Sequence, residues 1–125
     1  FEDIFEHCEY VSLHIPSTAE TKGVINMHLL KLLPKNGMLV NTARLDVVNE
    51  TDLLQLMGER NDITYVSDFV PKMEAAFNEK FAKRIFYPAK KMGAQTEEAN
   101  VNAGIAAAKQ IIDFLDKGID TFRVN

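Results

Sequence analysis

The architecture of this chain follows from one short segment, Met38-Leu39-Val40-Asn41-Thr42-Ala43-Arg44. Its first residues predict a short apolar strand, and the small polar residues that follow bring Arg44 to the carboxyl end of that strand. In open parallel α/β sheets, ligands bind in the crevice beyond that end of the strands. A guanidinium there can hold a carboxylate or a carbonyl oxygen through two parallel hydrogen bonds. Taken alone, the segment is better interpreted as a surface arginine in a loop. Other segments of the chain are needed to decide between this interpretation and a ligand-binding arginine.

Size, charge and hydropathy limit the possible classes of protein. The chain has 125 residues, which suits one ordinary domain, and its 46% hydrophobic and 26% charged residues are typical of a soluble globular protein. A net charge of −4 gives no overall attraction to phosphate backbones, so a nucleic-acid partner is not expected. No apolar run approaches the ~20 residues that span a bilayer, and no secretory leader is visible. The predicted location is therefore the cytoplasm, without a membrane partner.

The cysteine and the histidines argue against a metal site. Cys8 is the single cysteine, so a disulfide and a cysteine-built zinc site are both excluded, and we expect a buried free thiol. The three histidines, His7, His14 and His28, lack the spacing of metal ligands. We interpret His14 as a structural histidine bonded to the backbone.

Strands and helices are predicted in alternation. The predicted strands cover residues 10–15, 38–41, 63–67 and 85–87. The predicted helices cover residues 1–7, 27–33, 50–57, 74–83 and 97–117. Asn26, Asn49 and Thr96 are the expected N-caps, and Gly118 is expected to end the last helix. Such alternation predicts right-handed βαβ units and a parallel α/β sheet with consecutive strands as neighbours, about half of a doubly wound sheet.

Several segments together resemble the D-2-hydroxyacid dehydrogenase family, and most closely its 3-phosphoglycerate dehydrogenases. In family order and spacing they are residues 8–16 (CEYVSLHIP), 21–26 (TKGVIN), 40–44 (VNTAR), 68 (D), 93–99 (GAQTEEA) and 124–125 (VN). The resemblance implies that residues 1–95 are the second half of a Rossmann-like NAD-binding domain. It implies that residues 96–125 are a C-terminal helix and tail leading back to a substrate domain. The N-terminal half of the enzyme, which would carry the glycine-rich loop, is then missing.

The resemblance also implies roles for individual residues. Arg44 looks like the arginine that holds the substrate carboxylate, and Lys91 stands where the family has its general acid/base histidine. These two are the implied catalytic residues. The implied NAD contacts are Ile15, Thr42, Ala43, Arg44, Asp68, Lys91, Met92, Gly93 and Ala94.

The chain departs from the family pattern in two places. Met73 occupies the position of the catalytic glutamate, and Glu74 lies one residue later, so a shift of the loop is needed for Glu74 to replace it. Leu45 and Asp46 stand where the family has two glycines, which predicts a different backbone path after Arg44.

Lysine in place of histidine changes the acid–base problem. A histidine, with a pKa of ~6.5, benefits from a carboxylate that keeps it protonated, whereas a lysine, with a pKa of ~10.4, becomes a worse acid beside one. Loss of the glutamate, with Arg44 and Lys90 nearby, would instead lower the pKa of Lys91. The hypothesis is a lysine-dependent variant of the dehydrogenase; the plainer alternative makes Lys90 and Lys91 a solvated pair before a helix.

Three functions remain open at this stage. The resemblance favours an NAD-dependent oxidoreductase that converts 3-phosphoglycerate to 3-phosphohydroxypyruvate in serine biosynthesis. A related enzyme acting on glyoxylate, hydroxypyruvate or a D-lactate-like acid is the alternative within the family. A non-catalytic interaction module, like the corepressors that reuse this scaffold, is the alternative from another class. A small-molecule substrate and a homodimer are expected, and the strand at residues 10–14 is expected to be an unpaired edge that self-associates.

Overall fold

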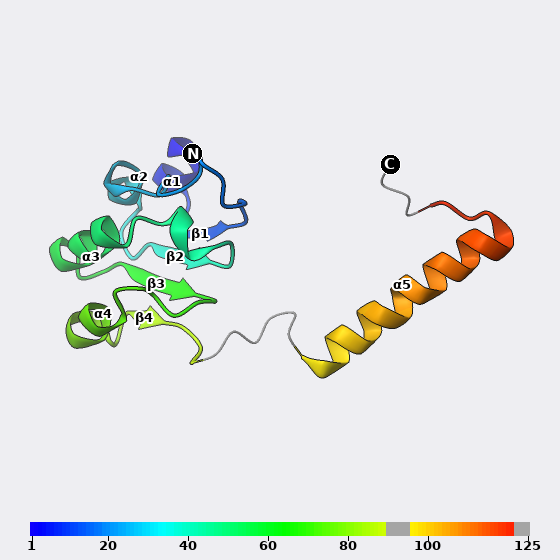
Figure 1. The fold of residues 1–125 in the computed structure, drawn as a ribbon. Coiled ribbons are helices and arrows are strands. Elements are labelled where there is room, and N and C mark those ends of the chain that lie inside the picture. The colour runs from blue at the N-terminus through cyan, green and yellow to red at the C-terminus, as the bar shows by residue number, and fades with distance from the viewer. Residues whose placement is uncertain (90–95, 122–125) are drawn as a thin grey trace. The chain divides into compact units, whose positions relative to one another are not determined.

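The computed structural model describes residues 1–89 and 96–121, which fall into two units, residues 1–89 and residues 96–121. In the first unit, strands and helices alternate along the chain (Figure 1). The second unit is built around one long helix.

Four strands form one parallel sheet in which strands consecutive in sequence lie side by side, as predicted. The register pairs Leu13 with Asn41 and Asn41 with Ser67, so the first three strands end at the same level. This is the parallel α/β sheet that the alternation predicted. The strands are β1 (Tyr10–Leu13), β2 (Met38–Asn41), β3 (Thr64–Ser67) and β4 (Ile85–Phe86).

Helices connect the strands and pack against one another in sequence order. Two predicted N-caps are confirmed, since the Asn26 side chain accepts hydrogen bonds from the backbone at the start of α2 and Asn49 does so at the start of α3. A 3-10 helix directly after Arg44 was not predicted. The bounds are α1 (Glu2–His7), α2 (Met27–Leu32), the 3-10 helix η1 (Leu45–Val47), α3 (Glu50–Glu59) and α4 (Glu74–Phe81).

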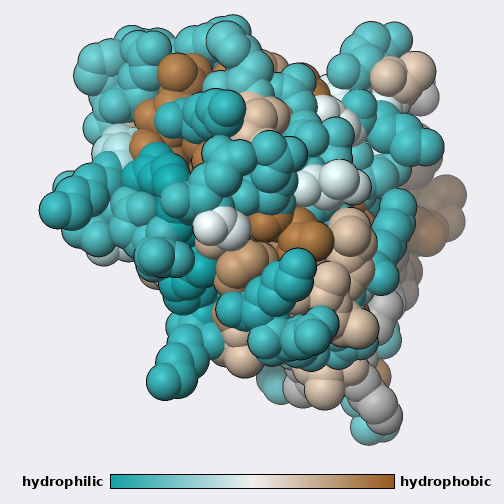
Figure 2. Space-filling view, turned by 90° about the vertical axis from the view of Figure 1, so that its left-hand side faces the viewer, coloured by the Kyte–Doolittle hydropathy of each residue, from teal (hydrophilic) through white to brown (hydrophobic). Residues whose placement is uncertain are grey.

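The core lies between the helices and one face of the sheet. Alternate strand residues are buried, as in Leu39 and Asn41 of β2 and Tyr65 and Ser67 of β3. The ring of Tyr65 packs against Phe77 of α4, with ring centroids 6.5 Å apart. On the side that carries α3 and α4, the surface is mainly hydrophilic, with small separate apolar patches (Figure 2).

The other face of the sheet is less covered by the described residues. Its positions alternate with the buried ones and are half-buried or exposed. Tyr10 on β1 is 70% exposed and Phe86 on β4 is 53% exposed. Within the described residues, this face of the sheet is therefore open. The strand order makes β1 and β4 the two edge strands.

Cys8 corrects one expectation. Its thiol is free, as predicted, but it is exposed instead of buried. Cys8 ends α1 and precedes β1, so it lies in the connection between two elements and outside the alternating pattern that buries Val11 and Leu13.

The second unit contains the longest helix, α5 (Glu97–Lys117). Thr96 caps it by accepting a hydrogen bond from the Ala99 amide, and Gly118 ends it in the left-handed conformation with φ 65°, both as predicted. Its large apolar side chains, including Ile112 and Leu115, are all at least 49% exposed within the described residues. Among those residues no helix combines the length and the apolar character that crossing a membrane requires.

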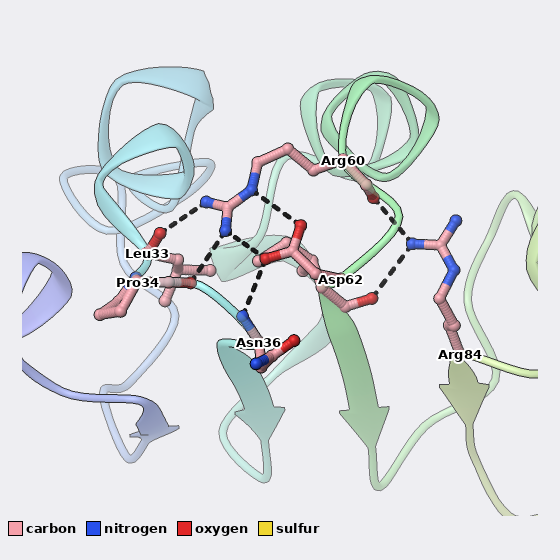
Figure 3. A network of polar contacts seen from close by, with 7 residues as sticks. Leu33, Pro34, Asn36, Arg60, Asp62 and Arg84 are labelled. Carbon is pink, nitrogen blue, oxygen red and sulfur yellow. Dashed lines mark hydrogen bonds and ion pairs between the residues drawn. The ribbon is translucent and has the colours of Figure 1, made fainter.

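A polar network holds together the loops at the amino-terminal edge of the sheet (Figure 3). The guanidinium of Arg60 donates to the carbonyls of Leu33 and Pro34, at the end of α2, and pairs with Asp62 at 2.6 Å. The Asp62 carboxylate also accepts from the backbone amide of Asn36 at 2.8 Å. These contacts join the segment before β2 to the segment before β3.

Arg84 extends the network to β4. Its guanidinium donates to the carbonyls of Met57, Arg60 and Ile63 at 2.9–3.2 Å and lies 4.9 Å from the ring centre of Phe81. The amino-terminal ends of β2, β3 and β4 are thus tied together by two guanidinium groups.

The first prediction concerns Asp62. The Arg60 guanidinium and the Asn36 amide hold the pKa of this carboxyl well below its usual value. A lowered folded-state pKa gives stability that is complete above the unfolded-state pKa of about 3.9 and is lost as the pH falls through the folded-state value. Because both side chains are 26% exposed, we expect Asp62→Asn to lower the free energy of unfolding at pH 7 by about 1–2 kcal/mol.

Urea unfolding at a series of pH values measures this effect. The difference between the wild-type chain and Asp62→Asn should shrink as the pH falls below about 4. Glu79→Gln, an exposed carboxylate on α4, is the control and should stay within about 0.5 kcal/mol. A difference that does not change with pH would contradict the assignment to Asp62.

The second prediction concerns the β1 edge. Tyr10 on β1 is exposed, and so are Phe1 and Ile4 at the start of α1, the helix that precedes β1. Unpaired strand edges associate readily. We expect the 125-residue chain to associate in sedimentation experiments and Tyr10→Lys to weaken that association. Phe86→Lys, on the opposite edge, is the matched control, and a larger effect there would assign the contact to β4.

Candidate functional site

The carboxyl ends of the strands bring the predicted site segments to one edge of the sheet. Residues 14–15 follow β1, residues 42–44 follow β2, and Asp68 follows β3. The three strands are parallel and their last residues are in register, so these segments leave the sheet beside one another. This is the edge at which ligands bind in open α/β sheets.

Asn41 anchors the segment that ends in Arg44. The side chain is completely buried, and its amide nitrogen donates to the Arg44 carbonyl at 3.0 Å and to the Tyr65 hydroxyl at 3.3 Å. Its amide oxygen accepts from the backbone amide of Ala43 at 3.1 Å. A buried polar group is costly unless it is hydrogen-bonded, so these contacts fix residues 41–44 in one turn.

The Arg44 side chain is exposed at this edge. Its Nη1 donates to the carbonyl of Ala43 at 2.7 Å, and no carboxylate within residues 1–89 and 96–121 forms an ion pair with it. Most of the donors of this guanidinium are therefore available to an anionic group from outside the described chain.

His14 contacts side chains, which corrects the expectation that it binds the backbone. Its Nε2 lies 2.8 Å from the Ser12 hydroxyl, and its Nδ1 lies 3.4 Å from the Thr42 hydroxyl. Thr42 in turn donates to the Leu13 carbonyl at 3.2 Å. Since the single hydroxyl proton of Thr42 is used in that bond, its oxygen is left to accept from Nδ1.

The other predicted contact residues lie beside these groups. Ile15 is half-buried against the core and Ala43 is buried. The backbone amide of Asp68 donates to the Asn41 carbonyl at 3.0 Å, which ties the ends of β2 and β3 together. The Asp68 carboxylate is partly exposed, and residues 1–89 and 96–121 supply no hydrogen bond or ion pair to it.

The loop after Arg44 is held by a second loop. Leu45 and Asp46 lie in η1, and neither has a positive φ angle. The backbone conformation at these two positions therefore does not require glycine. Asp46 accepts a hydrogen bond from the Ser17 hydroxyl at 2.7 Å, and that bond holds the pKa of Asp46 below its usual value. The Asp46 carbonyl accepts from the Gly23 amide at 2.7 Å.

The region around the expected glutamate position is engaged in structural contacts. The buried carboxylate of Glu50 accepts from the backbone amides of Lys72 and Met73 at 2.9–3.0 Å. Glu74 accepts from the Tyr87 hydroxyl at 3.0 Å. Partial desolvation and this neighbouring carboxylate raise the pKa of Tyr87. Four predicted site residues, Lys91, Met92, Gly93 and Ala94, lie outside the described residues.

Comparison with known proteins identifies the domain. Residues 1–86 match the family model described as the NAD-binding domain of D-isomer specific 2-hydroxyacid dehydrogenases. The chain belongs to this family. The predicted family and its cofactor, NAD, are thereby confirmed for the dehydrogenase domain.

The relatives of this domain include enzymes named after two different substrates, 3-phosphoglycerate and glyoxylate. The chain is 48% identical to the NAD+-bound 3-phosphoglycerate dehydrogenase of Entamoeba histolytica, with a TM-score of 0.80 over 99% of this chain and 41% of that chain. It is 29% identical to the D-3-phosphoglycerate dehydrogenase of Haemophilus influenzae over 99% of this chain and 32% of that protein. It is 32% identical to the glyoxylate reductase of Thermococcus litoralis over 100% of this chain and 38% of that protein. The chain thus spans between 32% and 41% of the length of these relatives.

Three residues of the edge were assigned no contact or role in the site from the sequence. They are Asn41, whose amide fixes the turn, and the pair Ser17 and Asp46, which joins two loops. For Asn41 a signal existed, because an amide at the last position of an apolar strand must find partners when it is buried. For Ser17 and Asp46 no local pattern indicates a contact across the sequence.

The third prediction concerns Asn41. Asn41→Ala removes three hydrogen bonds, to the Ala43 amide, the Arg44 carbonyl and the Tyr65 hydroxyl, so we expect the free energy of unfolding to fall by about 2 kcal/mol. Denaturant unfolding of the chain measures the change. Asn61→Ala, at an exposed position, is the control and should change stability by less than about 0.5 kcal/mol. Equal effects of the two variants would show that Asn41 is not an anchor.

Proposed function

We propose that the protein containing this chain is an NAD-dependent dehydrogenase of 2-hydroxy acids, with 3-phosphoglycerate as its substrate. The observation that carries the proposal is the shared edge beyond β1, β2 and β3, where the exposed Arg44 guanidinium follows the Asn41 turn. The names of the Entamoeba histolytica and Haemophilus influenzae relatives support the substrate.

Arg44 is proposed to hold the carboxylate of the substrate. An exposed guanidinium with unused donors suits a planar, two-pronged contact with a carboxylate. The Thr42 and Asp68 side chains and the partly buried Ile15 offer a mixed polar and apolar surface beside it. We assign them, with Ala43, to the nicotinamide end of NAD. The same assignment extends to Met92, Gly93 and Ala94.

Lys91 is proposed as the general acid/base. In the direction of oxidation its Nζ amine takes the proton of the C2 hydroxyl, so that the C2 oxygen becomes a carbonyl. When bound, NAD supplies the hydride acceptor. Met73 at the family's glutamate position has no carboxylate, and the carboxylate of the neighbouring Glu74 accepts a hydrogen bond from the Tyr87 hydroxyl. A lysine without a carboxylate partner is a better acid, because such a partner would raise its pKa.

The fourth prediction tests these roles in the enzyme that contains the chain. Lys91→Ala is expected to lower kcat at least about 100-fold while NAD affinity is retained, because a proton-transfer group is lost. Arg44→Lys is expected to lower kcat/KM for the acid, since an ammonium cannot reproduce the two-pronged contact. Lys35→Ala, at an exposed position before β2, is the control and should behave like the wild type.

Steady-state kinetics and calorimetry with NAD provide the measurements. Retained turnover in Lys91→Ala would refute the lysine mechanism. A substrate panel then separates 3-phosphoglycerate from the second candidate, glyoxylate reduction, which the Thermococcus litoralis relative favours. A D-lactate-like acid and hydroxypyruvate belong in the same panel. No turnover with any 2-hydroxy acid or 2-keto acid would favour a non-catalytic interaction module.

The assembly and location are also part of the proposal. We propose that the whole protein is a homodimer in the cytoplasm and that its substrate is a small molecule. The exposed apolar side chains of α5 and of the β1 edge support association. Sedimentation of the whole protein tests the dimer.

A further inference from the structure

A side-chain contact joins two loops at the carboxyl edge of the sheet. The Ser17 hydroxyl donates to Oδ2 of Asp46 at 2.7 Å, although the two residues are 29 positions apart. Ser17 belongs to the loop after β1, and Asp46 belongs to η1, two residues after Arg44. The Gly23 amide adds a second bond from the same loop to the Asp46 carbonyl, at 2.7 Å.

Further along, the two loops are joined by backbone pairing. The Ile25 amide donates to the Val47 carbonyl at 3.0 Å, and the Asn49 amide donates to the Ile25 carbonyl at 2.9 Å. Ile25 and Val47 are completely buried in the core. The η1 segment is therefore anchored in the core at its end, independently of Ser17.

Arg44 lies between two sets of anchors. On the inner side, Asn41 binds its carbonyl. On the outer side, the contact of Ser17 with Asp46 fixes the residues that follow it. Removing the outer contact leaves the buried anchors in place. We therefore expect it to change the direction of the Arg44 segment more than the stability of the fold.

The charge of Asp46 strengthens this contact. The Ser17 hydroxyl favours the ionised carboxylate, with smaller contributions from Lys22 and Lys72. A hydroxyl that donates to a carboxylate makes a shorter and stronger bond than one between neutral groups. At neutral pH the contact is thus a charge-assisted hydrogen bond between exposed loops.

We propose that Ser17 and Asp46 are a positioning pair that directs the Arg44 guanidinium toward the substrate carboxylate. The inference rests on the proposed function, because it takes Arg44 as the group that holds the acid. Neither residue touches the substrate; they act through the backbone of residues 44–46.

Kinetics of the whole enzyme with Ser17→Ala, Asp46→Ala and the double variant test the pair. Each variant is expected to raise KM for the acid about fivefold, with a smaller change in kcat and unchanged affinity for NAD. The double variant should match the single variants, because the two residues contribute one contact. Ser17→Thr keeps the hydroxyl and should restore the wild-type KM. Thr18→Ala, whose hydroxyl binds within its own loop, is the control and should leave KM unchanged.

The outcomes separate this inference from the proposed function. If the wild-type enzyme oxidises the acid and Arg44→Lys impairs it, but Ser17→Ala and Asp46→Ala behave like the wild type, the positioning pair is refuted. Additive effects in the double variant, or a loss of NAD affinity equal to the rise in KM, would also refute it. If the wild-type enzyme has no activity with 2-hydroxy acids, the proposed function fails first.

Discussion

Burial of the Asn41 amide is the constraint from which the carboxyl edge is built. A primary amide at the end of an apolar strand must satisfy its donors and acceptor without water. Asn41 does so through the Ala43 amide, the Arg44 carbonyl and the Tyr65 hydroxyl, so one side chain sets the turn and links β2 to β3. The direction in which Arg44 leaves the sheet follows from this arrangement.

The two edges of the sheet use their polar groups differently. At the amino-terminal edge, the guanidinium groups of Arg60 and Arg84 donate hydrogen bonds to backbone carbonyls, and Arg60 also donates to the Asp62 carboxylate. At the carboxyl edge, the Arg44 guanidinium donates to the neighbouring Ala43 carbonyl and to no other group among residues 1–89 and 96–121. Groups with satisfied donors stabilise the fold, whereas a guanidinium with unused donors can bind a ligand. The contrast between these arginines supports the proposal that the substrate binds at the carboxyl edge.

Much of the fold was predictable because most elements carry a local signal. The caps Asn26, Asn49 and Thr96 mark helix starts, and alternating elements dictate a parallel sheet. The 3-10 helix η1 has no side-chain cap, and its three residues are too few to show a helical period of apolar residues. It was therefore not predicted. The exposure of Cys8 could not be predicted, because burial depends on position between elements as well as on residue type.

Parts of the site followed from the same logic, since parallel strands deliver their ends to one edge. The partners of those residues did not follow. The contact of Ser17 with Asp46 and that of His14 with Thr42 join residues almost thirty positions apart, and only the packed fold brings them together. The short strands have a consequence of their own. With four residues in β2, the sheet is only about 13 Å deep along the chain direction. The hydrogen bonds at the Asn36 amide and at the Asn41 side chain thus lie near opposite ends of one four-residue strand, so β2 is anchored at both ends over a short distance.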